Sequence, residues 1–386
     1  MASYSAFDDS PVRVVAGDGA AAELWDLVGR LGTGPAFLVC GASVARRDWL
    51  SRLVQAAPVP LEVFAEVEPD PSDDTVTRAG AVAAAAGARV VIGVGGGSSM
   101  DAAKAIAAEA VAPGWVAAQD RPGEPTEITT APLPIVLVPT TAGTASEVTP
   151  FSVITFTQTR RKLVLNHPAL YARYAVLDPE LLVSAPRDAR VAAGLDALTH
   201  GVESYASRQA TPQTRARAYS AIEEIRTHLP GASADPPCVP SLGRLQWAAM
   251  VAGLAFSHTR LGIVHALALP VSALFGVPHG VANAILLPYG MRYNAPAAEA
   301  VYDDIARALG ETAGAGDLAP RAAEAVRRLA AAVGAPGSLA EVGVREEALA
   351  DMAAEAMKSA HIRVNPRPLE LEDLLEVYRQ ALHGEW

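Results

Sequence analysis

Residues 88–111, ARVVIGVGGGSSMDAAKAIAAEAV, carry the pattern that decides the fold. The run of Val and Ile at the start predicts a buried strand, the glycines at 95–97 predict a tight turn, and the alanine-rich remainder predicts a helix. A buried strand that leads directly into a helix is the repeating unit of a parallel sheet covered by helices. The segment therefore predicts an α/β domain.

The same alternation continues on both sides of this segment. Strands are predicted over 35–41, 60–67 and 134–141, and helices over 43–57 and 75–87. From about residue 186 helical periodicity dominates, over 186–207, 214–229, 244–258, 298–310, 321–333 and 372–382, and the Pro/Gly-rich stretch 229–241 predicts a loop. We expect an α/β domain with a parallel sheet over 1–185, and an all-α domain over 186–386.

Composition narrows the class of protein. The chain has 386 residues, 51% of them hydrophobic, and can bury a large core. Its net charge of −11 argues against nucleic acid or an anionic membrane as a partner. No signal-peptide pattern or membrane-spanning apolar run is evident, and two cysteines are too few for a disulfide scaffold. We expect a cytoplasmic protein.

Two glycine- and hydroxyl-rich loops favour a nucleotide cofactor. The turn at 93–104 offers free backbone amides at a helix N-terminus, and PTTAGTASEVTP (139–150) follows another strand with hydroxyls suited to phosphate and ribose. A tight structural turn is the alternative for the first loop. After the strand at 35–41 no acid is present for a ribose 2′-hydroxyl, and Ser43, Arg46 and Arg47 would tolerate a 2′-phosphate. An ordinary basic helix start is equally compatible, so NADH and NADPH both remain open.

Four side chains in the second half favour a metal site. Asp196 and His200 are spaced i, i+4 on one predicted helix face, although alone they could simply hydrogen-bond to each other. His265 and His279 lie in the apolar stretch 262–283, where an unpaired imidazole is costly to bury. One Asp and three His suit Fe, Zn, Co or Ni rather than Ca or Mg. A neighbouring dinucleotide domain favours a Lewis-acid role over a closed structural site.

The chain resembles the iron-dependent (group III) alcohol dehydrogenase family over nearly its full length. The segments that carry the resemblance are EVEPDP (66–71), GGGSSMDAAK (95–104), PTTAGTASEVTP (139–150), LDPEL (177–181), GLDALTHGVESY (194–205), AGLAF (252–256), VH (264–265), PHGVANAILLP (278–288) and NPR (365–367). The resemblance implies a dehydroquinate synthase-like fold and an NAD(P)-dependent alcohol dehydrogenase or aldehyde reductase. It also implies a small aldehyde or alcohol as substrate and a homodimer or larger homo-oligomer.

The resemblance also implies roles for individual residues. The metal, Fe2+ in the first place and Zn2+ as the alternative, would be held by Asp196, His200, His265 and His279. The residues expected to contact NAD(P)H, from the loops and from the resemblance together, are Gly41, Ser43, Gly95, Gly96, Gly97, Ser98, Asp101, Thr140, Thr141, Thr144 and Lys162. Among these, Gly96, Gly97 and Ser98 would hold the pyrophosphate, and Asp101 would lie near the nicotinamide.

The chain departs from the family at three places near the substrate. Many members carry a second histidine four residues after the ligand at 265, where this chain has Leu269, so a water, a ribose hydroxyl or His258 would replace it in proton transfer. Arg260 in FSHTRLG (256–262), and His361 and Arg363 in AHIRVNPR (360–367), are expected to border the substrate together with Leu269. Converging cations suit an anionic aldehyde such as phosphonoacetaldehyde. Alternatively, the arginines pair with local acids.

Three other functions remain to be weighed. A maleylacetate reductase-like enzyme also takes an anionic substrate, but those enzymes usually work without metal. A dehydroquinate synthase-like lyase would need several Lys and Arg residues for a phosphate, and a His/Glu metal set. A degenerate, non-catalytic binding protein would make Leu269 a mark of decay. The intact ligand set and the two intact loops favour the oxidoreductase.

Overall fold

The computed structural model describes residues 3–121, 127–312 and 318–386. The chain forms two compact units, one of Met1–Thr141 with Ala145–Ser184, the other of Ala142–Thr144 with Ala185–Trp386. The division places the tip of the 139–150 loop with the second unit. There a Cβ on Gly143 would lie 2.8 Å from the carbonyl oxygen of Ala193.

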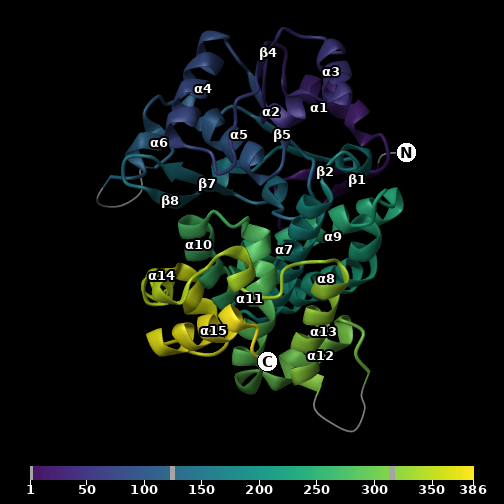
Figure 1. The fold of residues 1–386 in the computed structure, drawn as a ribbon. Coiled ribbons are helices and arrows are strands. Elements are labelled where there is room, and N and C mark those ends of the chain that lie inside the picture. The colour runs from purple at the N-terminus through teal and green to yellow at the C-terminus, as the bar shows by residue number, and fades with distance from the viewer. Residues whose placement is uncertain (1–2, 122–126, 313–317) are drawn as a thin grey trace. The chain divides into compact units, whose positions relative to one another are not determined.

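The first unit is built on a seven-stranded sheet within the described residues, in the order β1-β2-β9-β6-β5-β3-β4. Figure 1 labels β1, β2, β4 and β5 of this sheet. All neighbouring strands are parallel except β1 and β2. The strands are β1 Ser3–Ala6, β2 Arg13–Ala16, β3 Ala36–Cys40, β4 Leu61–Phe64, β5 Val90–Gly95, β6 Ile135–Pro139 and β9 Tyr174–Leu177. The three adjacent strands β3, β5 and β6 are buried at every position, as expected for strands covered on both faces.

Helices and a separate hairpin complete this unit. The helices are α1 Leu24–Leu31, α2 Ala42–Ala45, α3 Asp48–Gln55, α4 Asp73–Ala85, α5 Gly97–Glu109 and α6 Trp115–Ala118, with short 3-10 turns η1 Ala20–Glu23, η2 Ser146–Val148, η3 Pro168–Leu170 and η4 Pro179–Leu182. Strands β7 (Phe151–Phe156) and β8 (Arg161–Asn166) pair antiparallel in a sheet of their own. The predicted α/β class is confirmed. The single helix expected over 43–57 is instead two helices, interrupted at Arg46 and Arg47.

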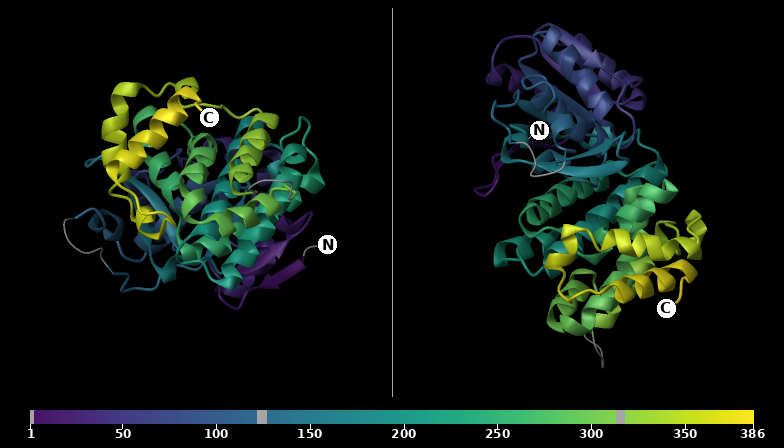
Figure 2. Two further views of the ribbon diagram at one scale, coloured as in Figure 1. Left: turned by 90° about the horizontal axis from the view of Figure 1, so that it is seen from below. Right: turned by 90° about the vertical axis from the view of Figure 1, so that its left-hand side faces the viewer.

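The second unit is helical in all its described elements, which confirms the predicted class. Its helices are α7 Arg187–Ala206, α8 Pro212–Ala232, α9 Val239–Thr259, α10 Ile263–Phe275, α11 His279–Asn294, α12 Glu299–Ala308, α13 Leu318–Ala332, α14 Leu349–Ala356 and α15 Leu371–His383, with short turns η5 Ala295–Ala297, η6 Ala340–Val342, η7 Glu346–Ala348 and η8 Ala360–Val364. Helices α7, α8 and α9 pack on one another, and α14 lies beside α15 near the C-terminus (Figure 2).

The loop predicted over 229–241 is much shorter than expected. Helix α8 continues through Pro230 to Ala232, and α9 already begins at Val239 with a proline in its first turn. Proline is tolerated in the first turn of a helix because the amide it lacks there has no intrahelical partner. Among the described residues no single helix is long and apolar enough to span a membrane. Helices α9 and α10 reach the required length and apolar composition only when they are taken together, and the chain bends by 105° between them.

Candidate metal centre and cofactor loops

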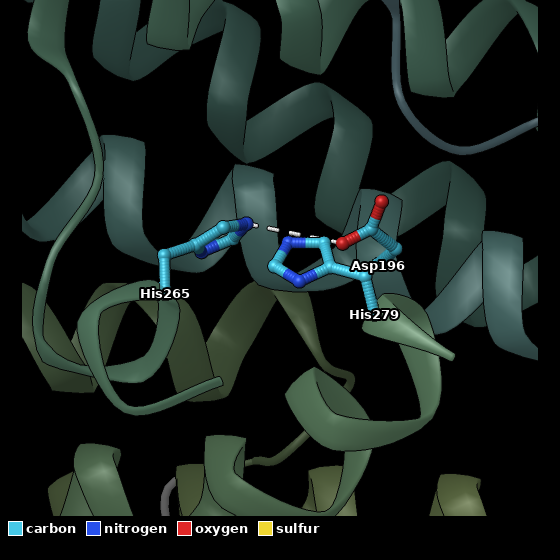
Figure 3. Close-up of side chains that lie close together, drawn as sticks. All are labelled: Asp196, His265 and His279. Atoms are coloured by element: carbon cyan, nitrogen blue, oxygen red, sulfur yellow. Dashed lines mark ion pairs between the residues drawn. The ribbon is translucent and has the colours of Figure 1, made fainter. Parts of the chain in front are cut away.

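Three of the four predicted ligands converge in the second unit. Asp196 lies on α7, His265 in the first turn of α10, and His279 is the first residue of α11. Their ligand atoms all lie within 4.8 Å of one another, and Nε2 of His265 is 3.8 Å from Oδ1 of Asp196. Figure 3 shows the three side chains pointing toward one another. Two imidazoles and a carboxylate form a donor set that suits a divalent transition metal.

The amide of Asn283 supplies a direct test of that fit. Its Nδ2 lies 2.7 Å from Oδ1 of Asp196, 3.2 Å from Nε2 of His265 and 3.1 Å from Nε2 of His279. The donor atoms of all three side chains thus face one partially positive group, as they would face a cation. The Oδ1 of Asn283 is buried without a hydrogen-bond partner among the described residues. The residues present therefore fit a metal ion.

The fourth predicted ligand, His200, lies beside this group but outside the 4.8 Å set. Its Nε2 is 3.8 Å from Oδ1 of Asp196, and its ring stacks on His265 with centroids 4.9 Å apart. The ring also packs against Phe256 at 4.4 Å. Its Nδ1 is buried and has no hydrogen-bond partner among the described residues. The role of His200 as a ligand stays a prediction.

Burial and mutual proximity set the charge state of the cluster. Burial lowers the pKa of His265 well below its usual value, and His200 and His279 lower it further, so the imidazole is neutral. Burial alone would raise the pKa of Asp196, but the neighbouring histidines and the Asn283 hydrogen bond outweigh it and the pKa is lowered. A neutral imidazole beside an ionised carboxylate is the form that binds metal.

Glu203, which the sequence analysis did not single out, contacts His265 directly. Its Oε2 lies 2.6 Å from Nδ1 of His265, and its Oε1 accepts a hydrogen bond from the amide of Val264 at 2.6 Å. Burial raises the pKa of Glu203, and backbone amides at the start of α10 oppose that effect. The sequence signal was its helical spacing, three residues after His200 and seven after Asp196.

The predicted cofactor loops follow three adjacent parallel strands of the first unit. The loops leave β3 at Gly41, β5 at Gly95 and β6 at Thr140, and the chain reverses its direction of winding between β3 and β5. Ligands of open α/β sheets bind at this edge, beyond such a reversal. Helix α5 has no side-chain cap at its N-terminus, so its first amides can face an anion. A Cβ on Gly95, whose φ is 150°, would lie only 2.5 Å from Oγ of Ser99.

Other predicted cofactor residues are already engaged within the unit. Ser98 accepts a hydrogen bond from the amide of Asp70, and Lys162 forms an ion pair with Asp70 at 2.5 Å, so both lie near the start of α5. Asp101 accepts hydrogen bonds from Oγ of Ser146 at 2.5 Å and from the amide of Val153 at 3.0 Å. The structure therefore shows a role for Asp101 in tying α5 to the β7 hairpin, and its nicotinamide contact stays a prediction.

The basic segment after β3 is partly occupied. A guanidinium nitrogen of Arg47 donates to the carbonyl of Ser184 at 3.0 Å, whereas Ser43 and Arg46 are exposed. Thr140 is buried, and Thr141 and Thr144 are half-buried. Tolerance for a 2′-phosphate at this loop stays a prediction that rests on Ser43 and Arg46.

The predicted substrate residues divide by burial. Arg260, Arg363 and His258 are exposed, and neither guanidinium has an ion-pair or hydrogen-bond partner among the described residues. His361 accepts a hydrogen bond from the amide of Leu261 at 3.3 Å, and burial lowers its pKa to about 4. His361 is thus neutral rather than the cation that we expected. Leu269 is half-buried on α10, one turn beyond His265.

The chain is similar to known proteins over most of its length. Residues 11–179 match the family model described as iron-containing alcohol dehydrogenase, and residues 190–382 match its C-terminal counterpart. A 1,3-propanediol dehydrogenase of Citrobacter freundii is 38% identical over 85% of each chain. A lactaldehyde reductase of Escherichia coli K12 is 37% identical over 95% of this chain and 96% of the relative. The solved sulfoacetaldehyde reductase of Bifidobacterium kashiwanohense, in complex with NAD+, is 27% identical with a TM-score of 0.89 and covers 99% of this chain and 98% of its own.

Proposed function

Because this chain belongs to the iron-containing alcohol dehydrogenase family and is an oxidoreductase of that class, we propose that it reduces a small anionic aldehyde with NAD(P)H. The overall reaction consumes the aldehyde, NAD(P)H and a proton, and yields the alcohol and NAD(P)+. The observation that carries the proposal is the convergence of Asp196, His265 and His279 on one point in the second unit. The glycine-rich, uncapped start of α5 in the first unit supports a dinucleotide cofactor.

The chain's own residues bind and orient the reactants. When bound, a divalent metal supplies polarisation of the carbonyl group, and NAD(P)H supplies the hydride. Asp196, His265 and His279 would hold the metal, with His200 as the fourth ligand. The first amides of α5, at Gly97 and Ser98, would hold the pyrophosphate.

Leu269 offers no proton for the reaction. Leu269 presents a hydrocarbon one helical turn beyond His265, where many relatives have a histidine. The proton that completes the alcohol must therefore come from water, from a ribose hydroxyl of the cofactor or from His258. We propose Fe2+ as the metal, with Zn2+ as the alternative, and a homo-oligomeric enzyme.

Two unpaired arginines support the anionic substrate. The predicted alternative, pairing with local acids, finds no support for Arg260 or Arg363 among the described residues. The hydrogen bond from Leu261 to His361 brings the segments that carry these arginines side by side. An exposed guanidinium binds carboxylate, sulfonate or phosphonate through paired hydrogen bonds. The structural likeness to a sulfoacetaldehyde reductase points to the same class of substrate.

The test is a substrate panel on the purified, metal-loaded enzyme. Oxidation of NADH and of NADPH is followed with sulfoacetaldehyde and phosphonoacetaldehyde, and with propionaldehyde and lactaldehyde as neutral controls. We expect kcat/KM to be roughly 10- to 100-fold higher for the anionic aldehydes, since a hydrogen bond to a charged group contributes about 1.5–3 kcal/mol. Equal or better use of the neutral aldehydes would contradict the anionic substrate. No oxidation with any aldehyde would contradict the reductase activity.

A further inference from the structure

The helix that carries His265 begins without a cap of its own. Its N-cap residue, Gly262, has no side chain, yet the first amides of α10 are buried. Instead, the amide of Ile263 donates to Oδ1 of Asn365 at 3.1 Å, and the amide of Val264 donates to Oε1 of Glu203 at 2.6 Å. Two side chains that are remote in sequence thus satisfy donors that a helix N-terminus leaves without intrahelical partners.

The other oxygen of the same carboxylate contacts the imidazole of His265. Oε2 of Glu203 lies 2.6 Å from Nδ1 and 3.4 Å from the amide nitrogen of His265. Both oxygens of Glu203 accept hydrogen bonds from backbone amides, and the donor nitrogen of Asn283 lies 3.2 Å from Nε2 of His265. This arrangement favours a neutral ring with its proton on Nδ1 and its lone pair on Nε2. That Nε2 is the atom that faces Asp196 and Asn283.

The contacts of Glu203 are concentrated on the start of α10, with His361 as a further electrostatic neighbour. Its side chain is 5% exposed, and the only basic group in an ion pair with it among the described residues is His265. A buried carboxylate is costly unless hydrogen bonds satisfy it, and here its backbone donors belong to the N-cap and first turn of α10. Both side chains pack closely against Gly262, because a Cβ at this position would lie 2.9 Å from Oε1 of Glu203 and 3.0 Å from Oδ1 of Asn365.

We propose that Glu203 is a positioning residue for the metal site: it fixes the orientation and the Nδ1–H tautomer of His265, and so aims the Nε2 lone pair at the metal. Carboxylates that hydrogen-bond to a metal-binding histidine act in this way, and their loss costs about 10- to 100-fold in metal affinity. Asn365 acts with Glu203 by anchoring the start of α10. The inference rests on the proposed metal site.

The substitution that tests this role is Glu203→Gln. The variant has nearly the same shape and keeps an oxygen for the amide of Val264, but its amide nitrogen would face Nδ1 as a second donor. His265 then has to move its proton to Nε2 or rotate its ring. The first change removes the lone pair that would bind the metal, and the second turns it away from the metal. We expect the affinity of the apoprotein for Co2+, measured by competition with a chromophoric chelator, to fall about 10- to 100-fold.

Glu109→Gln is the matched control. Glu109 is also a buried carboxylate that accepts from backbone amides, those of Gly114 at 2.6 Å and Val116 at 2.9 Å, but it lies in the first unit. It should leave the affinity for Co2+ unchanged. Wild-type affinity in Glu203→Gln would overturn the inference, whereas a wild-type protein that binds no Co2+ would overturn the metal site itself.

A second measurement needs no variant and no activity. Long-range proton–nitrogen NMR spectra of the histidine-labelled apoprotein report which ring nitrogen of His265 is protonated. We expect Nδ1–H in the wild type, assigned by the loss of the signal in His265→Gln. A wild-type ring protonated at Nε2 would overturn the proposed role even if Glu203→Gln did not fold.

Discussion

Asn283 donates a hydrogen bond from Nδ2 to Oδ1 of Asp196 across 2.7 Å, and by this bond α11 is joined to α7 at the centre of the ligand cluster. The same nitrogen lies 3.2 Å and 3.1 Å from the Nε2 atoms of His265 and His279. The amide therefore contacts all three ligand side chains, and a metal bound by them would compete with it for the same lone pairs.

Removing this amide should destabilise the apoprotein more than the metal-loaded protein. In Asn283→Ala the buried acceptors lose their donor, so we expect the free energy of unfolding of the apoprotein to fall by about 1–3 kcal/mol. A bound metal restores a partner without displacing an amide. The rise in Tm on addition of Co2+ should thus be larger in the variant than in the wild type. An equal or smaller rise would show that the amide does not compete with the metal.

A methyl group at position 262 should disturb the start of α10. In Gly262→Ala the new Cβ would press on Oε1 of Glu203 and Oδ1 of Asn365, both of which are held in place by hydrogen bonds. We expect a loss of about 1–3 kcal/mol in unfolding free energy, together with weaker Co2+ binding. Gly29→Ala on α1 is the control, because a Cβ there meets nothing within 4 Å. Wild-type Co2+ affinity in Gly262→Ala would count against the close packing described here.

Arg260 occupies a backbone conformation that suits glycine. Its φ of 56° and ψ of −171° lie in a region that costs other residues about 1–3 kcal/mol. Arg260→Gly should therefore stabilise the protein while it raises KM for an anionic aldehyde and leaves KM for a neutral aldehyde unchanged.

Arg160→Gly provides the control for Arg260→Gly. Arg160 also has a positive φ, 54°, in the turn between β7 and β8. Its replacement should stabilise the protein without any change in KM. If Arg260→Gly also leaves KM for sulfoacetaldehyde unchanged, the guanidinium does not bind the substrate.

Glu147 should contribute a pH-dependent term to stability. Burial raises its pKa from 4.5 to about 7, although Lys104 opposes that effect. The folded state thus holds the proton more tightly than the unfolded state. The resulting stabilisation is fully present below pH 4.5 and is lost as the pH rises through about 7, by up to about 3 kcal/mol.

Glu147→Gln removes this titration. Relative to the wild type, the variant should gain stability between about pH 5 and about pH 8, as measured by Tm at both values. Parallel pH profiles of the two proteins would contradict the buried, titrating state of Glu147.

Much of the fold was predictable because the periodicity of hydrophobic residues can be read from a single sequence. The apolar run before Gly95 gave β5, and the i, i+4 spacing of Asp196 and His200 placed both on α7. His265 and His279 were found because an imidazole in apolar sequence needs a partner. The extension of α8 through Pro230 was missed because proline usually signals a break.

Burial and long-range contacts account for what the sequence did not show. Nothing in AHIRVNPR indicates that His361 is half-buried and neutral, or that Asn365 binds the start of α10 some hundred residues earlier in the chain. Glu203 and Asn283 lie within the stretches that attracted attention, at helical spacing from His200 and His279. Their roles become visible only when α7, α10 and α11 are brought together.

The central claim is that this chain uses a metal held by Asp196, His265 and His279 to reduce aldehydes with NAD(P)H. The most direct test is to remove metal with a chelator and to follow NAD(P)H oxidation with sulfoacetaldehyde before and after adding back Fe2+ or Zn2+. We expect the activity to disappear with the metal and to return with one equivalent per chain in the wild type but not in His279→Ala. Full activity in the metal-free enzyme, or full restoration in His279→Ala, would contradict the account.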